Sequence, residues 1–548
     1  MLNYSHALQL NSIPYKVGAL ARAGFKSMSI RLYCGWPRLP QGEPVQGGTM
    51  GKSVLIIGAG IAGLAAGSYL QRNGFTTHIF DQHTLPGGLC TAWERQGYRF
   101  DGCIHWLMGS SPRSNMHHIW RELGAGELNY LEWDIFTVIK LSDGDRFTVY
   151  TDPDRFEAEL SRLAGPDDSP LIKSIAAAIR NMSRFDLPAA WDKLTLPEAA
   201  RILFALPGAL PIFGTWMKLP IASLLARIAS PKLREALSGL YSGDMGDFPV
   251  AGLFMMLGFM SKKSCGYPLG GSSAFARSIE KKYLSLGGSI SYGFRVDRIL
   301  VENGKAVGIA GEKGELRGDL VISAADAHDT VERLLGGRYR SPGLDKAFAS
   351  FRRFPSLLLL GLGLKGDFSS YPHSYSFPLK QPLVLEGGEL TLLGMGIRFF
   401  SFDPGAAPAG KTAAMVMIST TNDSWWTELR ARDRSAYDAA KEESKRRIIA
   451  ALDSELPGIA SAVEYSDLST PATLIRYTNN WHGSYEGWLP TIKTMGAKLP
   501  RTLDGLAGFY MLGQWLNPGG GLPPCGIDGR RLAKRLCQAE GRSFRADA

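Results

Sequence analysis

Two glycine-rich stretches, one near each end of the 548-residue chain, have the residue types and spacing of a phosphate-binding site. The first is GAGIAG, Gly58 to Gly63, directly after the apolar run VLII. Its first glycine permits a tight turn, its second lets a pyrophosphate approach the backbone, and its third lets the following helix pack on the strand. The N-terminus of that helix offers free N–H groups and a positive dipole end to phosphates. We therefore expect a dinucleotide at Gly58, Gly60, Ile61, Ala62 and Gly63.

A strand, a helix and a second strand must position this turn. Residues 54–57 form a short apolar run typical of a buried parallel strand, and apolar residues at helical spacing continue to Asn73-Gly74. The second strand, 77–80, ends on Asp81, 23 positions after the first glycine. An acid there accepts hydrogen bonds from a ribose and disfavours a 2′-phosphate. The motif alone does not distinguish NAD from FAD.

The stretch that follows, HTLPGGLCTAWERQGYRFDGCIHWL (83–107), helps to distinguish them. It resembles the phytoene desaturase, carotenoid isomerase and retinol saturase branch of the FAD-dependent oxidoreductases, cousins of the amine oxidases. The resemblance implies that Gly87-Gly88 contacts the diphosphate and ribityl region of FAD and that the turn FDGC (100–103) passes under the isoalloxazine ring. Gln82 and Leu89, next to these positions, are implied cofactor contacts as well.

The resemblance continues through three later segments. YPLGGSSAFARSIEKKYLSLGGSISYGFRVDRILVENGKAVGI (267–309) is similar to the segment that returns to the FAD domain, and it implies that Val296 meets the adenine through its backbone. Its pattern predicts a helix over 271–286 and then short strands separated by Asn303-Gly304 and Lys313-Gly314 turns. LVISAAD (320–326) is similar to the last strand before the chain leaves this domain, and TPATLIRYTNNWHGSYEGWLPT (470–491) to the block before the final flavin loop.

The second glycine-rich stretch, FYMLGQWLNPGGGLPPCGIDG (509–529), resembles the closing FAD motif of this branch. Glycines let the backbone reach the ring edge, and a helix N-terminus stabilises negative charge on reduced flavin. The implied FAD contacts are Gly513, Gln514, Gly520, Gly521, Leu522 and Pro523. Many relatives carry an acid where Gln514 stands, and an amide can still bond the ribityl chain. Asp528-Gly529 replaces the frequent Ser-Gly, which leaves the helix contacts open.

The length predicts two or more domains. The resemblance implies an α/β fold with a Rossmann-type FAD/NAD(P)-binding domain that is discontinuous in sequence, and an α+β substrate domain with an apolar helical part. We assign 50–112, 265–335 and 490–548 to the FAD domain, and 113–264 with 336–489 to the substrate domain. The strand-like runs 356–364 and 413–421 are expected to form a sheet below the substrate pocket.

Residues 1–49 carry five basic residues and one acid. They resemble an organelle transit peptide. Met50 precedes the first predicted strand directly, so we favour an over-extended start or a disordered leader.

Two apolar stretches, 206–229 and 250–260, lie in the predicted substrate domain. The first is interrupted by three prolines, and the second has too few residues to span a bilayer. Core helices are the favoured interpretation, and an entrance that dips into a membrane is the alternative.

Composition and charge restrict the partners. The net charge of +10 comes without a nucleic-acid-binding motif, so we expect no nucleic acid and favour anionic lipid head groups. The six cysteines form no CxxC pair and no zinc-like cluster with histidine, which argues against a metal and a disulfide framework. We expect a cytoplasmic protein, peripheral to a membrane if it contacts one, whose oligomeric state stays open.

The expected function is that of an FAD-dependent oxidoreductase acting at flavin N5 on a lipophilic, carotenoid-like or retinoid-like polyene, by desaturation, saturation or isomerisation. His105 is the candidate catalytic residue, although a lone histidine is more often structural. Tyr485, Trp488 and Trp515 line the pocket or belong to the core. The alternatives are a flavin amine oxidase, which usually has an aromatic cage and a lysine near N5, and a non-catalytic flavoprotein.

Overall fold

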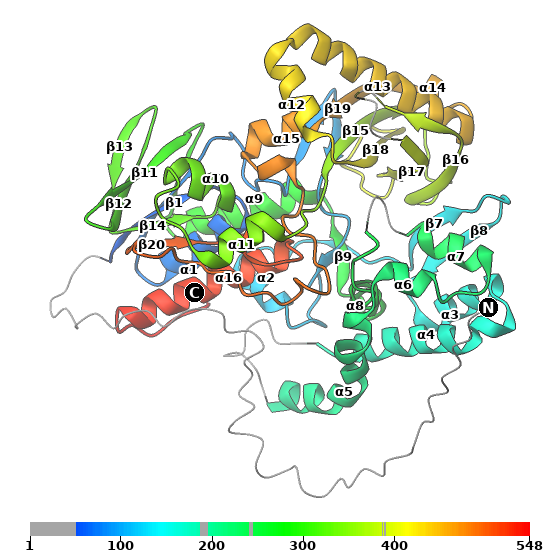
Figure 1. Cartoon of the computed structure of the whole chain (residues 1–548), viewed down its shortest axis with the longest axis horizontal. Helices are drawn as coiled ribbons and strands as arrows, with labels where there is room; N and C mark the ends of the chain where they lie inside the picture. The colour runs from blue at the N-terminus through cyan, green and yellow to red at the C-terminus, as the bar shows by residue number, and fades with distance from the viewer. Residues whose placement is uncertain (1–50, 187–195, 241–244, 386, 388–390, 548) are drawn as a thin grey trace, which may run out of the picture. The chain divides into compact units, whose positions relative to one another are not determined.

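The computed structural model describes residues 51–186, 196–240, 245–385, 387 and 391–547. The leader predicted for residues 1–49 therefore lies outside the described residues. The predicted α/β class with a Rossmann-type domain is confirmed by the sheets and helices of the described part (Figure 1).

The first sheet in the described part has five parallel strands in the order β10-β2-β1-β14-β20. Their bounds are Ser289–Tyr292, Thr76–Asp81, Ser53–Ile57, Leu320–Ser323 and Phe509–Met511, respectively. The central strand β1 is buried from Val54 to Ile57, because helices cover the faces of a parallel sheet. The strands expected at 54–57, 77–80 and 320–326 are thus confirmed, with their ends shifted by one to three residues.

Three helices pack beside this sheet, namely α1 (Ile61–Arg72), α9 (Gly271–Ser285) and α16 (Leu522–Ala539), and α1 contacts both others. Glycine permits both close approaches of α1: a Cβ on Gly67 would lie 2.7 Å from the Tyr283 ring of α9, and one on Gly529 would lie 2.6 Å from the Ala66 nitrogen. A buried ion pair between Arg530 and Glu122 (2.8 Å) adds a further link. The beginning and the end of the described chain therefore share one core.

A small antiparallel sheet follows α9 and β10. Its strands are β11 (Val296–Glu302), β12 (Lys305–Gly311) and β13 (Gly314–Arg317). The predicted turns at Asn303-Gly304 and Lys313-Gly314 connect them, and all but Lys313 have positive φ. Asn and Gly are the residues that hairpin turns of this kind require.

The second large sheet has the order β19-β15-β18-β17-β16-β7-β8 and is antiparallel except between β16 and β7. Its bounds are Val463–Ser469, Ser356–Lys365, Lys411–Thr420, Thr391–Phe399, Ser374–Val384, Ile135–Lys140 and Arg146–Tyr150. The strands predicted at 356–364 and 413–421 are confirmed as the neighbours β15 and β18. The strands of each large sheet fall within one set of the expected domain ranges, while the division into domains stays a prediction.

Strand β15 also connects this sheet to the segment with the FDGC turn. A Cβ on Gly361 would lie 2.5 Å from Phe100, and one on Gly363 would lie 2.5 Å from Tyr98. Both aromatic residues belong to β4 (Tyr98–Asp101), which pairs with β3 (Ala92–Arg95). The glycines thus let the β3–β4 hairpin lie directly on the sheet.

The other helices and short strands connect these sheets. Around the second sheet lie α12 (Asp423–Arg432), α13 (Arg434–Glu455), α14 (Ile459–Ala462) and α15 (Pro471–Thr478), whereas α11 (Pro342–Ser350) packs into the core of the first sheet. Helix α2 spans His117–Glu122, and a small sheet is formed by β5 (Leu107–Met108), β9 (Cys265–Pro268) and β6 (Tyr130–Leu131). The short helix α10 (Ala327–Asp329) follows β14.

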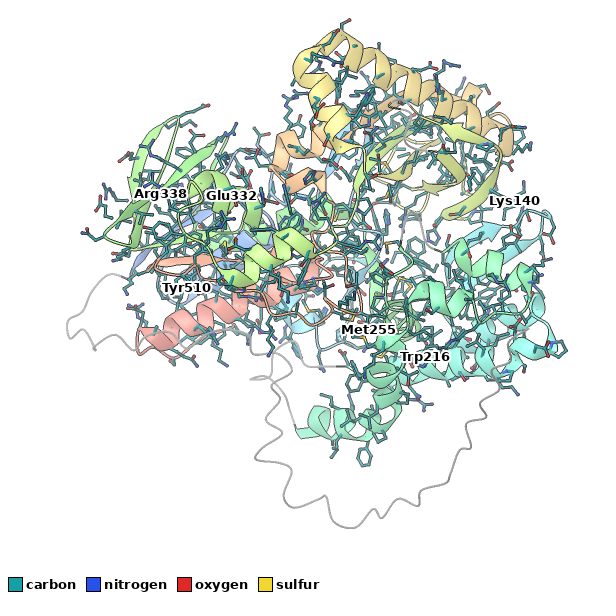
Figure 2. The ribbon with its side chains drawn as sticks, in the orientation of Figure 1. Lys140, Trp216, Met255, Glu332, Arg338 and Tyr510 are labelled. Atoms are coloured by element: carbon teal, nitrogen blue, oxygen red, sulfur yellow. The ribbon has the colours of Figure 1, made fainter. Side chains whose placement is uncertain are left out.

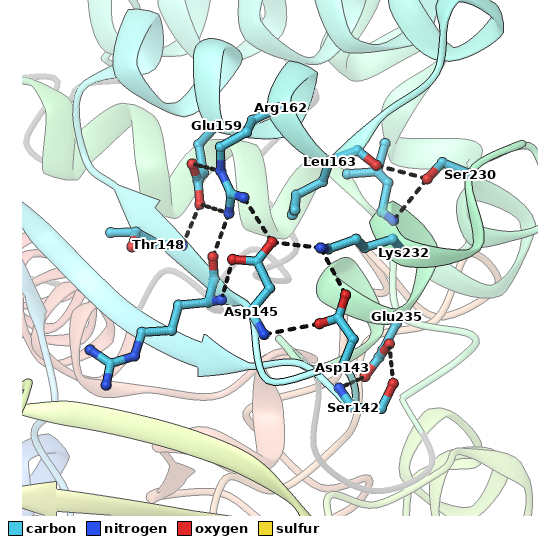
Figure 3. Close-up of polar contacts among 12 residues, drawn as sticks. Ser142, Asp143, Asp145, Thr148, Glu159, Arg162, Leu163, Ser230, Lys232 and Glu235 are labelled. Carbon is cyan, nitrogen blue, oxygen red and sulfur yellow. Dashed lines mark hydrogen bonds and ion pairs between the residues drawn. The ribbon is translucent and has the colours of Figure 1, made fainter.

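The helical part has its own apolar core. It consists of α3 (Pro153–Leu163), α4 (Ser169–Arg184), α5 (Leu196–Gly214), α6 (Ile221–Leu225), α7 (Pro231–Ser238) and α8 (Ala251–Ser261). Trp216 and Met255, labelled in Figure 2, belong to this core or pack against it. Ion pairs of Arg162 and Lys232 with Asp145 (2.8 and 2.6 Å) tie the β7–β8 hairpin to α3 and α7 (Figure 3).

The prediction of core helices is confirmed for the second apolar stretch and wrong for part of the first. Helix α8 is apolar on all sides and largely buried. Helix α5, which begins before the first stretch, exposes Leu210 within that stretch by 58%, and Leu203 and Phe204 just before it by 57% and 86%. Within the described residues, Ala200–Lys218 is the helical stretch long and apolar enough to cross a membrane. An apolar composition predicts that the side chains of a helix are shielded from water. It does not tell whether the rest of the protein or another apolar phase shields them.

Candidate active site

The turn between β1 and α1 has the geometry of a pyrophosphate site. Helix α1 has Gly60 as its N-cap, with no side-chain cap and no acidic residue in its first turn. Its first N–H groups therefore keep no side-chain acceptor, and they favour an anion. A Cβ on Gly60 would meet nothing nearer than the Gly87 carbonyl oxygen at 3.8 Å. The space beside Gly60 is open, as the approach of a phosphate requires.

The structure brings Gly87 and Gly88 onto this turn. The Gly87 N–H donates to the Ala59 carbonyl (2.9 Å), and Gly60 and Gly87 form a parallel bridge. A Cβ on Gly88 would lie 3.4 Å from the Gly60 Cα. Both glycines have positive φ, 110° and 62°, which glycine adopts readily. The diglycine therefore lies beside the turn before α1, and the neighbouring Leu89 is half-buried, while their contacts with a cofactor stay predictions.

Asp81 lies at the carboxyl end of β2, beside the same turn. Its carboxylate accepts hydrogen bonds from the N–H groups of Ala59 (2.6 Å) and His83 (2.7 Å). Burial raises the pKa of Asp81, and these two hydrogen bonds act in the opposite direction. Because a carboxylate has about four acceptor positions, two remain for ribose hydroxyls.

Two more predicted contacts lie near Asp81. The Phe294 N–H donates to the Asp81 carbonyl (2.9 Å), which brings the start of β11 alongside β2. The Val296 side chain is buried, and its carbonyl accepts a hydrogen bond from Arg333 (3.1 Å). The Gln82 side chain accepts one from Asn479 (3.0 Å). Their contacts with a cofactor stay predictions.

The closing segment reaches the first turn of α1. A Cβ on Gly513 would lie 4.0 Å from the Cβ of Ala62, although the two residues are 451 positions apart. Gly519, Gly520 and Gly521 have φ values of 98°, 50° and 87°. Any other residue is strained in this left-handed region, so the loop requires three consecutive glycines. Two distant stretches of the chain thus form one site.

Helix α16 provides a second uncapped N-terminus at this loop. Its N-cap is Gly521, and its first turn contains Leu522 and Pro523 but no acid and no side-chain cap. Gln514 lies within 3.5 Å of Asn480, which also accepts the indole N–H of Trp515 (2.7 Å). Both helix N-termini and the loop glycines fit the diphosphate and ring of a flavin dinucleotide.

Asp528, which stands where relatives often have serine, serves the scaffold of this loop. Its carboxylate binds Arg501 (2.9 Å) and accepts a hydrogen bond from Asn517 (2.8 Å), and the Arg501–Asp528 pair is almost fully buried. The Asn517 amide also donates to the Gly513 carbonyl (3.0 Å). The departure from the family pattern therefore connects the loop to its helix.

Glu486 is a residue of the site that the sequence reasoning missed. A Cβ on Gly520 would overlap its carbonyl oxygen, and one on Gly521 would lie 3.1 Å from its Oε1. Burial raises the pKa of Glu486 to about 8, and its carboxyl group has no hydrogen-bond partner among the described residues. The signal in the sequence was an acid within the block 470–491, but a loop acid is usually solvated.

His105 lies just past the FDGC turn. The adjacent Ile104 N–H donates to the Ser272 hydroxyl (2.8 Å), and the His105 carbonyl accepts from Arg398 (2.9 Å). Burial, and then the Arg398 charge, lower the pKa of His105 to about 3, so the ring is neutral at pH 7. Its Nε2 is buried without a partner. A catalytic role stays a prediction.

The candidate pocket aromatics divide into two groups. Trp488 and Trp515 are buried in the core, with ring centroids 4.9 Å apart in an edge-to-face pair. Tyr485, next to Glu486, is half-buried and contacts Phe354 at 5.0 Å between centroids. The two tryptophans therefore have the core role that was the alternative to lining the pocket.

Comparison with known proteins also indicates a dinucleotide-binding domain. Residues 56–123 match the family model of an NAD(P)-binding Rossmann-like domain. The chain is 26% identical to the phytoene desaturase (neurosporene-forming) of Cereibacter sphaeroides, over 86% of this chain and 91% of that protein. It is 25% identical to the chloroplastic prolycopene isomerase of Arabidopsis thaliana, over 90% and 84%. It is 24% identical to the all-trans-retinol 13,14-reductase of Danio rerio, over 88% and 84%.

Solved structures show the same fold at lower identity. An oxidoreductase from Methanosarcina mazei superimposes with a TM-score of 0.56 at 16% identity, over 88% of this chain and all of that one. A putrescine oxidase variant gives 0.57 at 13% identity, over 89% and 99%. These likenesses concern the fold alone, whereas the sequence matches extend over most of the chain and of each relative. The chain is therefore an oxidoreductase that is similar, over most of its length, to phytoene desaturases, prolycopene isomerases and a retinol reductase.

Proposed function

We propose that the protein binds FAD and uses it to desaturate, saturate or isomerise a lipophilic polyene of the carotenoid or retinoid kind. The observation that carries the proposal is the meeting of Gly513 with Ala62, because it joins the two glycine-rich stretches in one site. The named activities of the relatives support the polyene.

Backbone groups of this chain, together with one carboxylate, would hold the cofactor. The α1 N-terminus with Gly60 and Gly88 would bind the diphosphate, Asp81 the ribose, and the N-terminus of α16 the ring edge. A bound flavin supplies hydride or electron transfer, which no side chain can supply. Burial of the surrounding side chains excludes water from the transfer.

Glu486 can act as a hydrogen-bond donor or proton source beside the ring loop. Its raised pKa of about 8 keeps the carboxyl group protonated at neutral pH. A carboxylate there would compete with reduced flavin for the α16 N-terminus, whereas a carboxylic acid donates a hydrogen bond to an anion. This role is our inference from its position at Gly520 and Gly521.

We further propose that α5 forms a membrane-contacting entrance for the substrate. Its exposed residues Leu203, Phe204 and Leu210 support this, and the net charge of +10 favours anionic lipid. Trp216, within the apolar stretch 206–229, is buried and packs on Phe254 with ring centroids 4.9 Å apart. The contact is therefore expected on the outer side chains of α5.

The function is tested with the purified protein and its visible spectrum. We expect a yellow protein that releases FAD on denaturation, and a bound flavin whose absorbance bleaches on anaerobic addition of a polyene, or of a reductant followed by reoxidation with the polyene. Bleaching by an amine instead would assign the protein to the amine oxidases, and a colourless protein that does not take up added FAD would refute the proposal.

A further inference from the structure

Arg398 is a buried cation that forms no ion pair within the described residues. It lies on β17 and is 8% exposed. Its Nη2 donates to the His105 carbonyl (2.9 Å), while its Nε has no partner. Burial lowers the pKa of Arg398 to about 10, so the side chain stays charged at neutral pH. A buried charge without a partner costs several kcal/mol, so its retention requires a reason.

The nearest acid is already engaged by other groups. Asp101 attracts Arg398 electrostatically but forms no hydrogen bond with it. The Asp101 carboxylate instead accepts hydrogen bonds from the Ser272 N–H (2.7 Å) and the Ser272 hydroxyl (2.5 Å). It also accepts from the Tyr267 hydroxyl (3.0 Å) and the Cys103 N–H (3.1 Å). Asp101 is thus part of the scaffold and leaves the Arg398 charge without a carboxylate in contact.

Three more nitrogens around Arg398 lack a partner in the described structure: Nε2 of His105, Nε2 of His373 and Nε1 of Trp133. Trp133 and His373 are stacked, with centroids 3.7 Å apart, and Arg398 lies 5.9 Å from the Trp133 ring. Burial and the Arg398 charge lower the pKa of each histidine to about 3, so both are neutral.

This arrangement is unusual for a folded protein. Roughly 90% or more of buried polar groups have a hydrogen-bond partner, and four unpartnered nitrogens in one cluster call for an explanation. The four nitrogens are shielded from bulk solvent. They come from four separate places in the sequence and are brought together by the second sheet and the segment after the FDGC turn.

The chemistry of the cluster identifies the missing partner as an anion. The Nε–H of arginine and the Nε1–H of tryptophan only donate, so the partner must accept hydrogen bonds. The positive charge in a dry environment favours a negative group strongly. Aromatic rings complete the surroundings, with Phe402 at 4.8 Å from Trp133 and 5.2 Å from Tyr267 between centroids. A small anion on a lipophilic body fits both features.

We propose that Arg398, Trp133 and the two histidines bind the carboxylate end of a lipophilic polyene acid. The inference rests on the proposed function, since His105 follows the turn expected under the flavin and would place the polyene chain toward the ring. The head group reaches the nitrogens by a side-chain movement, and the half-buried Phe402 is the residue expected to move. The protein then prefers polyene acids to hydrocarbons, esters and alcohols of the same length.

The test measures equilibrium binding to the flavin-loaded full-length protein by tryptophan fluorescence quenching. The probes are all-trans-retinoate, its methyl ester and all-trans-retinol, which share one polyene body. We expect retinoate to bind at least tenfold more tightly than the ester. Arg398→Met should remove this preference and leave ester binding unchanged, and Trp133→Phe, which keeps a ring but loses the N–H, should reduce it several-fold.

Two further measurements exclude a purely structural role. Arg353→Met is the matched control, because Arg353 is a half-buried arginine that lies over Trp481 (4.6 Å) instead of in this cluster, and it should leave the preference intact. Without ligand, Arg398→Met should melt at or above the wild-type temperature, since it removes an uncompensated charge.

The outcomes separate this inference from the proposed function. Equal binding of acid, ester and alcohol by a protein that carries flavin overturns the carboxylate site and leaves the polyene function in place. A lower melting temperature of Arg398→Met with an unchanged preference overturns it as well. If no probe binds the flavin-loaded protein, both the inference and the retinoid form of the proposed function fail.

Discussion

The dinucleotide site and the Arg398 cluster are built from different chemistry. The first is made of backbone: two uncapped helix N-termini, positive-φ glycines and one aspartate, most of them within short sequence motifs. The second is made of side chains from β17, from two loops and from the segment before β7, none of which forms a motif. Backbone recognition leaves a local pattern in the sequence, whereas a side-chain cluster depends on tertiary packing.

The largest expected effect tests the dinucleotide site, which is built from backbone groups. Gly60→Val should give a folded but colourless protein. It should fold because a Cβ at Gly60 would have no protein atom nearer than 3.8 Å, and it should lose the flavin because the new side chain would clash with a bound pyrophosphate. Gly63→Val is the contrasting variant, since its Cβ would overlap the Gly58 carbonyl and should prevent folding. Flavin content and the melting temperature measure both. A yellow Gly60→Val protein would contradict the dinucleotide site.

The next effect concerns the exposed apolar face of α5, which, like the Arg398 cluster, is a surface made of side chains that no sequence motif marks. Replacing Leu203, Phe204 and Leu210 by serine should weaken binding to anionic liposomes at least tenfold, because burying each large apolar side chain contributes about 1.5 kcal/mol or more. Flotation with liposomes measures it, and the flavin spectrum should not change.

The matched control for α5 is the same substitution at three scattered exposed leucines, Leu284, Leu316 and Leu393. Isolated apolar side chains are ordinary surface features, so this variant should bind liposomes as the wild type does. Equal losses in the two triple variants, or a wild-type protein that stays off the liposomes, would rule out the α5 entrance.

The smallest expected effect is a change in the pH dependence of stability, and it concerns Glu486. This residue is an exception to the comparison, because it contributes a side chain to the site that is otherwise built from backbone. Its pKa is raised from about 4.5 to about 8, so the native state holds a proton that the unfolded chain releases. The resulting stability is present below about pH 4.5 and is lost as pH rises through 8. Glu486→Gln should abolish this loss.

Thermal or urea unfolding of the flavin-free protein at pH 5 and pH 9 checks it. The wild type should lose about 2 kcal/mol more than Glu486→Gln between the two values, a figure reduced from the full shift because the side chain is only partly buried. The reduction potential of the loaded flavin should also change less steeply with pH in the variant. Parallel behaviour of the two proteins in both measurements would remove Glu486 from the site.

The sequence by itself determined the dinucleotide half of the molecule. The strand, turn, helix and acid around Gly58–Gly63 lie within about one structural unit, and glycine, unlike other residues, can satisfy the steric requirements there. The three consecutive glycines at 519–521 are also explained locally, because each has a positive φ that other residues adopt only with strain. The resemblance added the connection between the two ends.

Only the tertiary structure decided the rest, since it depends on contacts between distant residues. Glu486 becomes a protonated acid because Gly520 and Gly521 pack against it, and α5 is exposed although its composition is as apolar as that of a core helix. Arg398 resembles any strand arginine in the sequence, and it becomes a candidate anion receptor only because folding buries it beside Trp133 and His105 without a carboxylate. Burial and partners set the chemistry of a side chain, and neither can be read from its neighbours along the chain.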